Sequence, residues 1–104
     1  MPHRVYVIRL DSAVLQNHRF AARNPNYVPG KPCVYVGRTS LLPEERFQKH
    51  KNGIKANRFV LEFGLYLMKR AYSKYPPQKY PEILAMEKAL AGRLQRKGYA
   101  VWYG

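Results

Sequence analysis

The chain has 104 residues, with 19 Lys and Arg against 6 Asp and Glu, and its formal net charge is +13. This length predicts a single domain over residues 1–104, and a hydrophobic content of 46% excludes a disordered basic tail. No apolar run approaches the roughly 20 residues of a membrane span, and the N-terminus lacks the features of a secretory signal, so we expect a cytoplasmic protein without a membrane partner. Cys33 is the single cysteine, which excludes an internal disulfide framework and a cysteine-built zinc site.

Two segments in the first third of the chain are rich in β-branched and aromatic residues and predict strands over 4–10 and 33–37. The segment between them contains the turn-forming sequences NPN and PGKP. We therefore expect residues 11–32 to form an irregular insertion between the first two strands, with at most a short helix over 15–22.

The clearest helix signal covers residues 43–52. Pro43 suits the first position of a helix, because the N–H that proline lacks has no partner there. Glu44 and Glu45 follow in the first turn, where the helix dipole favours negative charge. An Asn-Gly pair at 52–53 tolerates the left-handed conformation that ends many helices.

The second half of the chain predicts a helix over 55–63, a strand over 65–69, and a long helix that begins at Pro81 and ends near Lys97. Residues 99–103 are either a terminal strand or an extended tail. Short strands combined with a few helices indicate a small α+β layer fold.

The charge balance points to a polyanionic partner. Lys and Arg side chains that neutralise phosphates release counterions, which favours a nucleic-acid partner, DNA or RNA. An anionic membrane surface fits less well, since no helix is apolar on one face and uniformly basic on the other. The six acids are scattered along the chain, whereas a two-metal nuclease needs a cluster of carboxylates. Any metal chemistry is therefore expected to use a single cation.

One acid falls where the helical pattern calls for an apolar residue. At 100° per residue Glu87 lies about 40° from Ile83, inside the stripe that also holds Leu90 and Leu94, whereas Glu82 lies at its flank. Burial of an unpaired carboxylate costs several kcal/mol. Glu87 is therefore either a structural partner of a basic residue or a carboxylate aimed into a cleft to hold a cation or a proton.

The helix predicted over 43–52 carries Arg46 and His50, which are four residues apart and therefore project from the same face. Phe47 lies beside that face and is expected to anchor it to the core. On its own, such a pair is better explained as part of a solvated basic surface.

Several local features coincide along the chain. Tyr6 lies in the first strand in the sequence Val-Tyr-Val, Tyr35 begins Tyr-Val-Gly in the second, Arg46 and His50 share the next helix, and Glu87 lies on the last one. This arrangement resembles the GIY-YIG nuclease family, which is named for two tyrosine-bearing strand motifs. The resemblance extends from residue 4 to about residue 101 and implies a small three-stranded antiparallel sheet flanked by helices.

The resemblance also implies a role for each matching residue. Tyr35 corresponds to a tyrosine used as general base, and Tyr6 to one that helps to bind water or phosphate. Arg46 corresponds to a phosphate-binding arginine, and His50 is expected to accept a hydrogen bond from a tyrosine hydroxyl or a water. Glu87 corresponds to the acid that binds one divalent cation, Mg²⁺ or Mn²⁺.

The implied function is a metal-dependent endonuclease that hydrolyses DNA phosphodiester bonds. We expect neighbouring cations to contact the nucleic-acid backbone: Arg38, Lys49, Lys51, Lys55 and Arg58.

Departures from the family pattern leave alternatives open. The first motif reads Arg-Val-Tyr without a glycine, and the two tyrosines are 29 positions apart, so residues 11–32 must be an insertion. The asparagine that often follows the late helix is missing, and Asn57 is a candidate substitute. These departures fit a catalytically inactive nucleic-acid-binding module. A third interpretation, an unrelated basic RNA-binding protein, predicts that the candidate residues do not converge. The oligomeric state is left open.

Overall fold

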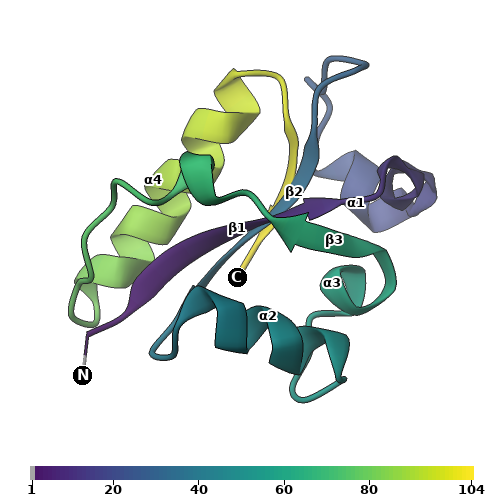
Figure 1. Ribbon diagram of the computed structural model, residues 1–104. Coiled ribbons are helices and arrows are strands. Elements are labelled where there is room, and N and C mark those ends of the chain that lie inside the picture. The colour runs from purple at the N-terminus through teal and green to yellow at the C-terminus, as the bar shows by residue number, and fades with distance from the viewer. Residues whose placement is uncertain (1) are drawn as a thin grey trace.

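A computed structural model describes residues 2–104 of the chain (Figure 1). In chain order the elements are β1 (Arg4–Leu10), the 3-10 turn η1 (Ser12–Gln16), α1 (His18–Ala22), β2 (Cys33–Thr39), α2 (Pro43–Lys51), α3 (Arg58–Phe63), β3 (Gly64–Leu67), the 3-10 turn η2 (Lys69–Ala71), α4 (Glu82–Arg96) and β4 (Ala100–Tyr103). The predicted α+β class is confirmed.

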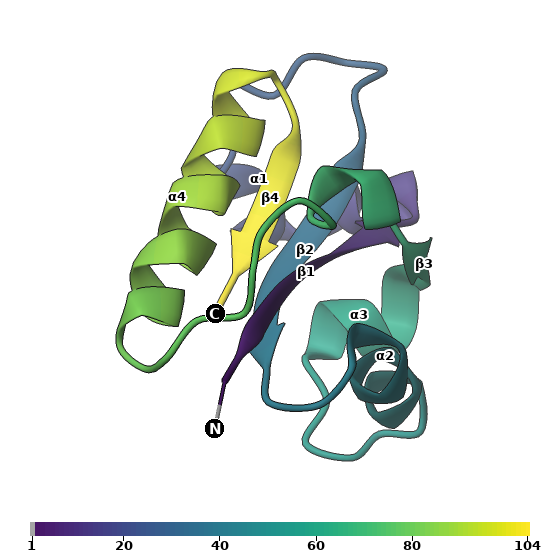
Figure 2. The same ribbon diagram turned by 60° about the vertical axis from the view of Figure 1, so that its left-hand side comes forward.

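The sheet has four strands in the order β3-β1-β2-β4. β1 pairs antiparallel with both β2 and β3, but β4 pairs parallel with β2. The prediction of a three-stranded, purely antiparallel sheet is therefore wrong. The pairing is parallel because α4 carries the chain back across the sheet, so that β4 runs in the same direction as β2 (Figure 2). The terminal segment is a strand and not a tail, because it pairs with β2 from Ala100 to Tyr103.

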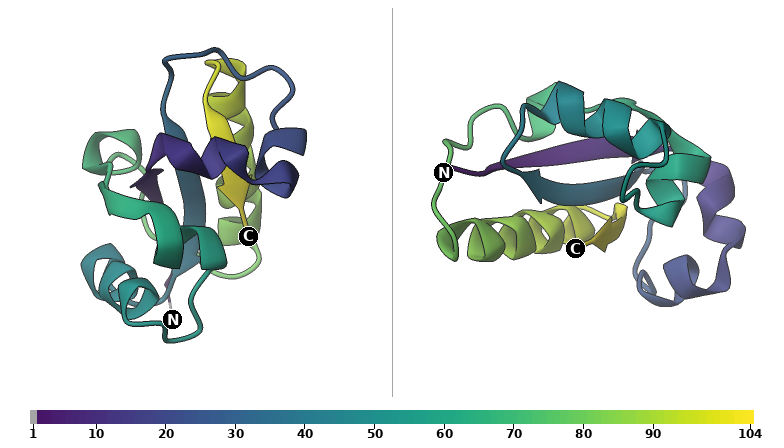
Figure 3. Two further views of the ribbon diagram at one scale, coloured as in Figure 1. Left: turned by 90° about the vertical axis from the view of Figure 1, so that its right-hand side faces the viewer. Right: turned by 90° about the horizontal axis from the view of Figure 1, so that it is seen from below.

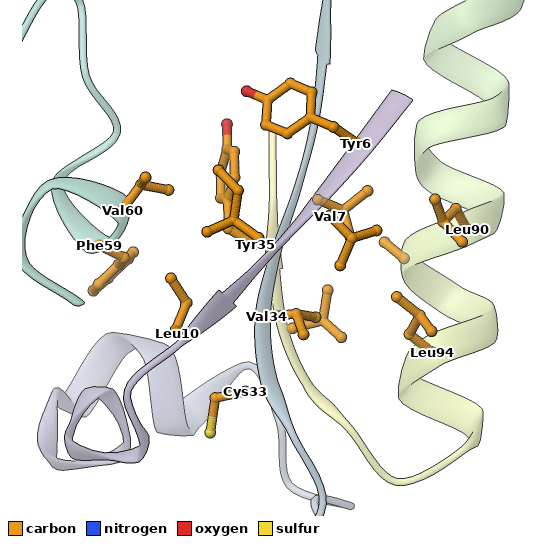
Figure 4. Close-up of a cluster of buried hydrophobic side chains, with 14 of the residues drawn as sticks. Tyr6, Val7, Leu10, Cys33, Val34, Tyr35, Phe59, Val60, Leu90 and Leu94 are labelled. Atoms are coloured by element: carbon orange, nitrogen blue, oxygen red, sulfur yellow. The ribbon is translucent and has the colours of Figure 1, made fainter. Parts of the chain in front are cut away.

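The sheet lies between two layers of helices (Figure 3, right). α4 covers one face, where Val7 and Val34 point toward Leu90 and Leu94, and α2 and α3 cover the other (Figure 4). Alternate residues of a strand point to opposite faces, so β1 and β2 contribute side chains to both layers. The buried side chains of the two faces belong to one hydrophobic cluster.

The connection between β1 and β2 is irregular, as expected, but it is anchored. The Asn24 side chain accepts a hydrogen bond from the Val101 N–H at 2.7 Å and donates to the Val101 carbonyl at 3.0 Å. The Arg23 guanidinium lies 3.7 Å from the centre of the Trp102 ring. These contacts bind the segment to β4, and its two short helical turns, η1 and α1, pack at one end of the sheet (Figure 3, right).

α3 begins later than the predicted helix over 55–63. The Asn57 side-chain oxygen accepts hydrogen bonds from the N–H groups of Phe59 at 2.9 Å and Val60 at 3.2 Å, so Asn57 caps the helix, which starts at Arg58. No helix formed by residues 2–104 has both the length and the apolar character that crossing a bilayer requires.

Candidate active site

A cleft of about 680 Å³ opens where β2 ends, between α2 and the first half of α4. It is lined by most of the residues predicted from the sequence: Tyr6, Tyr35, Arg38, Arg46, Lys49, Lys55 and Glu87. His50 does not line the cleft but is buried directly behind Tyr6. Residues from both ends of the chain therefore converge on one cavity, contrary to the expectation for an unrelated basic protein.

The cleft joins the two faces of the sheet. Tyr35 and Arg38 are three residues apart on β2, so they point to opposite faces. Pairing of β4 with β2 extends to Val36, and the cleft opens beside the following residues of β2. At this edge the side chains of the α2 face and of the α4 face reach the same space.

Gly37 allows the two tyrosines to lie close together. It stands opposite Tyr6 in the β1–β2 register and two residues after Tyr35, on the same face of the sheet. A Cβ at this position would lie 2.5 Å from Tyr6 Cζ and Oη and 2.8 Å from Tyr35 Cε2. Because no side chain fits there, the tyrosine ring centres approach to 6.1 Å, and their hydroxyls converge on the same region (Figure 4).

His50 donates a hydrogen bond to Tyr6. The Asn57 backbone N–H donates to His50 Nδ1 at 3.1 Å, so in the neutral ring the proton must be on Nε2. His50 Nε2 lies 2.9 Å from Tyr6 Oη. Burial, and next the Arg46 charge, lower the pKa of His50 from 6.5 to about 4, which keeps the ring neutral at pH 7. The expected direction, with His50 as acceptor from a tyrosine, is thus reversed.

The two tyrosines differ in acidity. Burial is the main cause that raises the pKa of Tyr6 far above its usual value, so its hydroxyl stays protonated. Burial and then the Glu87 charge also raise the pKa of Tyr35, but Arg46, the Tyr6 hydroxyl and Arg38 act in the opposite direction. Tyr35 is therefore the easier of the two to ionise, and any added positive charge near Glu87 favours its phenolate.

Arg46 is held at the mouth of the cleft. Its Nη1 donates to the Ile54 carbonyl at 3.2 Å and its Nη2 to the Lys55 carbonyl at 2.9 Å. These bonds fix the loop between α2 and α3. A guanidinium has five N–H donors, so three remain for an anion in the cleft.

Glu87 is an acid among the buried apolar residues of α4, and only 4% of its surface is exposed. Arg38 Nη1 donates to both carboxylate oxygens, at 3.0 Å and 3.2 Å. Arg38 Nη2 donates a hydrogen bond to the Tyr80 hydroxyl at 3.4 Å. Burial raises the pKa of Glu87, and the Arg38 guanidinium partly offsets this effect. Both interpretations of Glu87 from the sequence thus hold in part: it has a basic partner, and it faces a cleft.

No significant match was found to any family model, curated protein or solved structure. Among residues 2–104, no three His, Cys, Asp or Glu side chains gather into a group that could hold a metal ion. A Mg²⁺ ion, however, is often held by only one or two protein carboxylates plus substrate phosphates and water. Glu87, a buried carboxylate that faces the cleft and already attracts a cationic group, fits that simpler arrangement.

Three of the residues singled out from the sequence lie elsewhere. Lys51 donates to the carbonyls of Gly64 at 3.0 Å and Leu61 at 3.2 Å, which stabilises the end of α3. The Arg58 guanidinium lies 5.5 Å from the centre of the Phe59 ring, outside the cleft lining. Asn57 caps α3 and therefore does not replace the missing asparagine.

Sequence analysis missed His3 and Tyr80, which also line the cleft. Their rings pack with centres 5.5 Å apart, beside Arg38. Both lie in connecting segments, one before β1 and one before α4, where no periodicity indicates which way a side chain points. The only signal was composition, since aromatic residues are frequent around the proline-rich segment 75–81.

Proposed function

We propose that the chain is a metal-dependent, GIY-YIG-like endonuclease domain that hydrolyses DNA phosphodiester bonds in the cytoplasm. The observation that carries this proposal is the convergence of two tyrosines, an arginine with free donors and a single buried carboxylate in one cleft. Of the described side chains that line the cleft, Glu87 is the one acid among several cations, so a phosphate backbone is the complementary ligand.

Hydrolysis of a phosphodiester needs a deprotonated water, donors for the phosphoryl oxygens and stabilisation of the leaving oxygen. Tyr35 is the group that accepts a proton from the attacking water. Burial and the Glu87 charge raise its pKa, Arg46, the Tyr6 hydroxyl and Arg38 act in the opposite direction, and a cation held by Glu87 would shift the balance further toward the phenolate. Arg46 donates its remaining N–H groups to a non-bridging oxygen. A divalent cation held by Glu87 would neutralise charge on the phosphoryl group and on the leaving oxygen.

Tyr6 and His50 orient this machinery. Because Nε2–H of His50 donates to the Tyr6 oxygen, the Tyr6 O–H is directed away from the histidine. It can donate to the Tyr35 oxygen or to a water in the cleft, and a bond to Tyr35 lowers the pKa of that residue. Tyr6 is thus a protonated hydrogen-bond donor, and Tyr35 is the base.

The test is nicking of supercoiled plasmid with Mg²⁺ or Mn²⁺. Glu87→Gln, Arg46→Gln and Tyr35→Phe are each expected to lower the rate by about 10²-fold or more. Each has a matched control outside the cleft, where we expect wild-type rates: Glu82→Gln, Arg58→Gln and Tyr66→Phe. Nicking that persists in the three cleft variants, or that falls equally in the controls, contradicts the mechanism.

A second candidate function is binding without hydrolysis. The Arg38–Glu87 ion pair favours it, because the carboxylate proposed to hold a cation already has a positive partner. A binding module predicts no nicking with either metal, together with DNA affinity that falls steeply as salt increases. The plasmid assay and a salt series of binding measurements distinguish the two functions.

A further inference from the structure

The ion pair between Arg38 and Glu87 occupies the place where a metal ion would bind. One guanidinium nitrogen, Nη1, contacts both oxygens of the carboxylate, at 3.0 Å and 3.2 Å. Glu87 comes from α4 and Arg38 from β2, 49 positions apart in the sequence. A buried carboxylate requires a compensating positive charge, and here the guanidinium supplies it.

Arg38 and a divalent cation cannot both take this position. The cation needs the carboxylate oxygens that Nη1 now contacts, and it would face the guanidinium charge at close range. The guanidinium must therefore leave for a metal ion to enter, and it needs another anion to make its departure favourable.

The surroundings of Arg38 allow such a movement. Its side chain is 31% exposed, whereas that of Glu87 is 5% exposed, so the arginine is on the solvent side of the pair. Its second partner, Tyr80, is itself 54% exposed and lies in the connection before α4. Glu87 is the one acidic side chain in the described cleft lining, which holds several cations, and we expect a phosphate of the bound nucleic acid to attract the displaced guanidinium.

We propose that Arg38 is the resident counter-charge of Glu87 and is exchanged for the divalent cation when nucleic acid binds. This inference rests on the proposed function and adds its regulation. Without nucleic acid, Arg38 holds the carboxylate and weakens metal binding. A phosphate in the cleft draws the guanidinium away and frees Glu87. Metal and nucleic acid therefore bind cooperatively, and by linkage each raises the affinity for the other by the same factor.

The test measures Mn²⁺ binding by electron paramagnetic resonance, with and without a short duplex whose backbone resists hydrolysis. Glu87→Gln supplies the background in each condition, so that the difference from it reports the Glu87 site alone. Without duplex, Arg38→Gln is expected to bind Mn²⁺ on the order of tenfold more tightly than the wild type. With duplex, the wild type gains affinity by a similar factor and Arg38→Gln gains much less.

Arg58→Gln is the control, because it removes an arginine charge at a position outside the cleft without touching Glu87. It should retain the wild-type coupling between duplex and metal. If loss of Arg38 unfolds the protein, the wild-type measurement with and without duplex still tests the exchange, because an Mn²⁺ affinity that the duplex leaves unchanged overturns it.

The outcomes separate the two proposals. Binding of Mn²⁺ at Glu87 that is unchanged by the duplex, or that is weakened in a folded Arg38→Gln protein, overturns the exchange and leaves the nuclease proposal standing. Absence of Glu87-dependent Mn²⁺ binding in every sample overturns the metal-dependent function, and the ion pair is then a structural one.

Discussion

The buried histidine makes a quantitative prediction about stability and pH. His50 is 1% exposed, and its pKa falls from 6.5 to about 4 on folding, mainly because burial disfavours the charged ring and secondly because Arg46 is near. Above pH 6.5 the ring is neutral in both states and does not make stability depend on pH. As the pH falls below 6.5, the unfolded chain binds a proton that the folded protein excludes, so stability decreases until the pH reaches about 4.

The size of the effect follows from the two pKa values. A difference of about 2.5 units corresponds to about 3 kcal/mol of unfolding free energy lost between pH 7 and pH 4. His50→Gln removes the titrating ring but retains an N–H that can donate to Tyr6. The variant is expected to be less stable at pH 7 by about 1 kcal/mol, because the Asn57 N–H loses its acceptor.

Urea denaturation followed by fluorescence provides the assay, since Trp102 is the single tryptophan and packs against Phe20 and Phe59 in the core. Other acids titrate over the same pH range, so the measured quantity is the difference between wild type and His50→Gln at each pH. This difference should shrink and change sign as the pH falls. His18→Gln, at an exposed histidine, should follow the wild type throughout. Parallel curves for wild type and His50→Gln would refute a neutral, desolvated His50.

Three further predictions concern the residues around the cleft. Gly37→Ala should lower stability by about 1–3 kcal/mol, measured by urea denaturation, because its Cβ would overlap the tyrosine rings. Tyr6→Phe leaves the Nε2–H of His50 without its acceptor and should cost about 1–3 kcal/mol in the same assay, whereas a cost near zero contradicts the hydrogen bond. Lys49→Gln should reduce the slope of log affinity for DNA against log salt by about one unit, measured by fluorescence anisotropy. Lys51→Gln should leave that slope unchanged and lower stability instead, because its ammonium binds the carbonyls at the end of α3.

Local signals were sufficient where one segment determines its own structure. The proline and the glutamates of the first turn predicted α2 over 43–52, and the helix covers Pro43–Lys51. The position of β4 depends on a partner strand far away in sequence. A short apolar segment such as 100–103 contains no information on whether it pairs, or in which direction, and this is why the sheet was predicted with three antiparallel strands.

The same distinction applies to the candidate site. Helical periodicity identified Glu87 as buried on the core side of α4, and the structure confirms its burial. Positive charge alone could not separate Lys49, which lines the cleft, from Lys51, which stabilises a helix end. These lysines are two positions apart on α2 and therefore point in different directions. The role of a charged side chain can be assigned only when its neighbours in space are known.

The register of β1 and β2 is the feature on which the whole site depends. Tyr6 lies opposite Gly37, which leaves room for the tyrosine rings on the α2 face. Arg38, the next residue of β2, then points to the α4 face, where it pairs with Glu87. A slip of one residue would exchange the faces, burying Arg38 under α2 and placing Tyr35 against α4. Such a slip would leave both the arginine and the glutamate as unpaired buried charges, which costs several kcal/mol. The Arg38–Glu87 ion pair therefore also favours the register that builds the cleft.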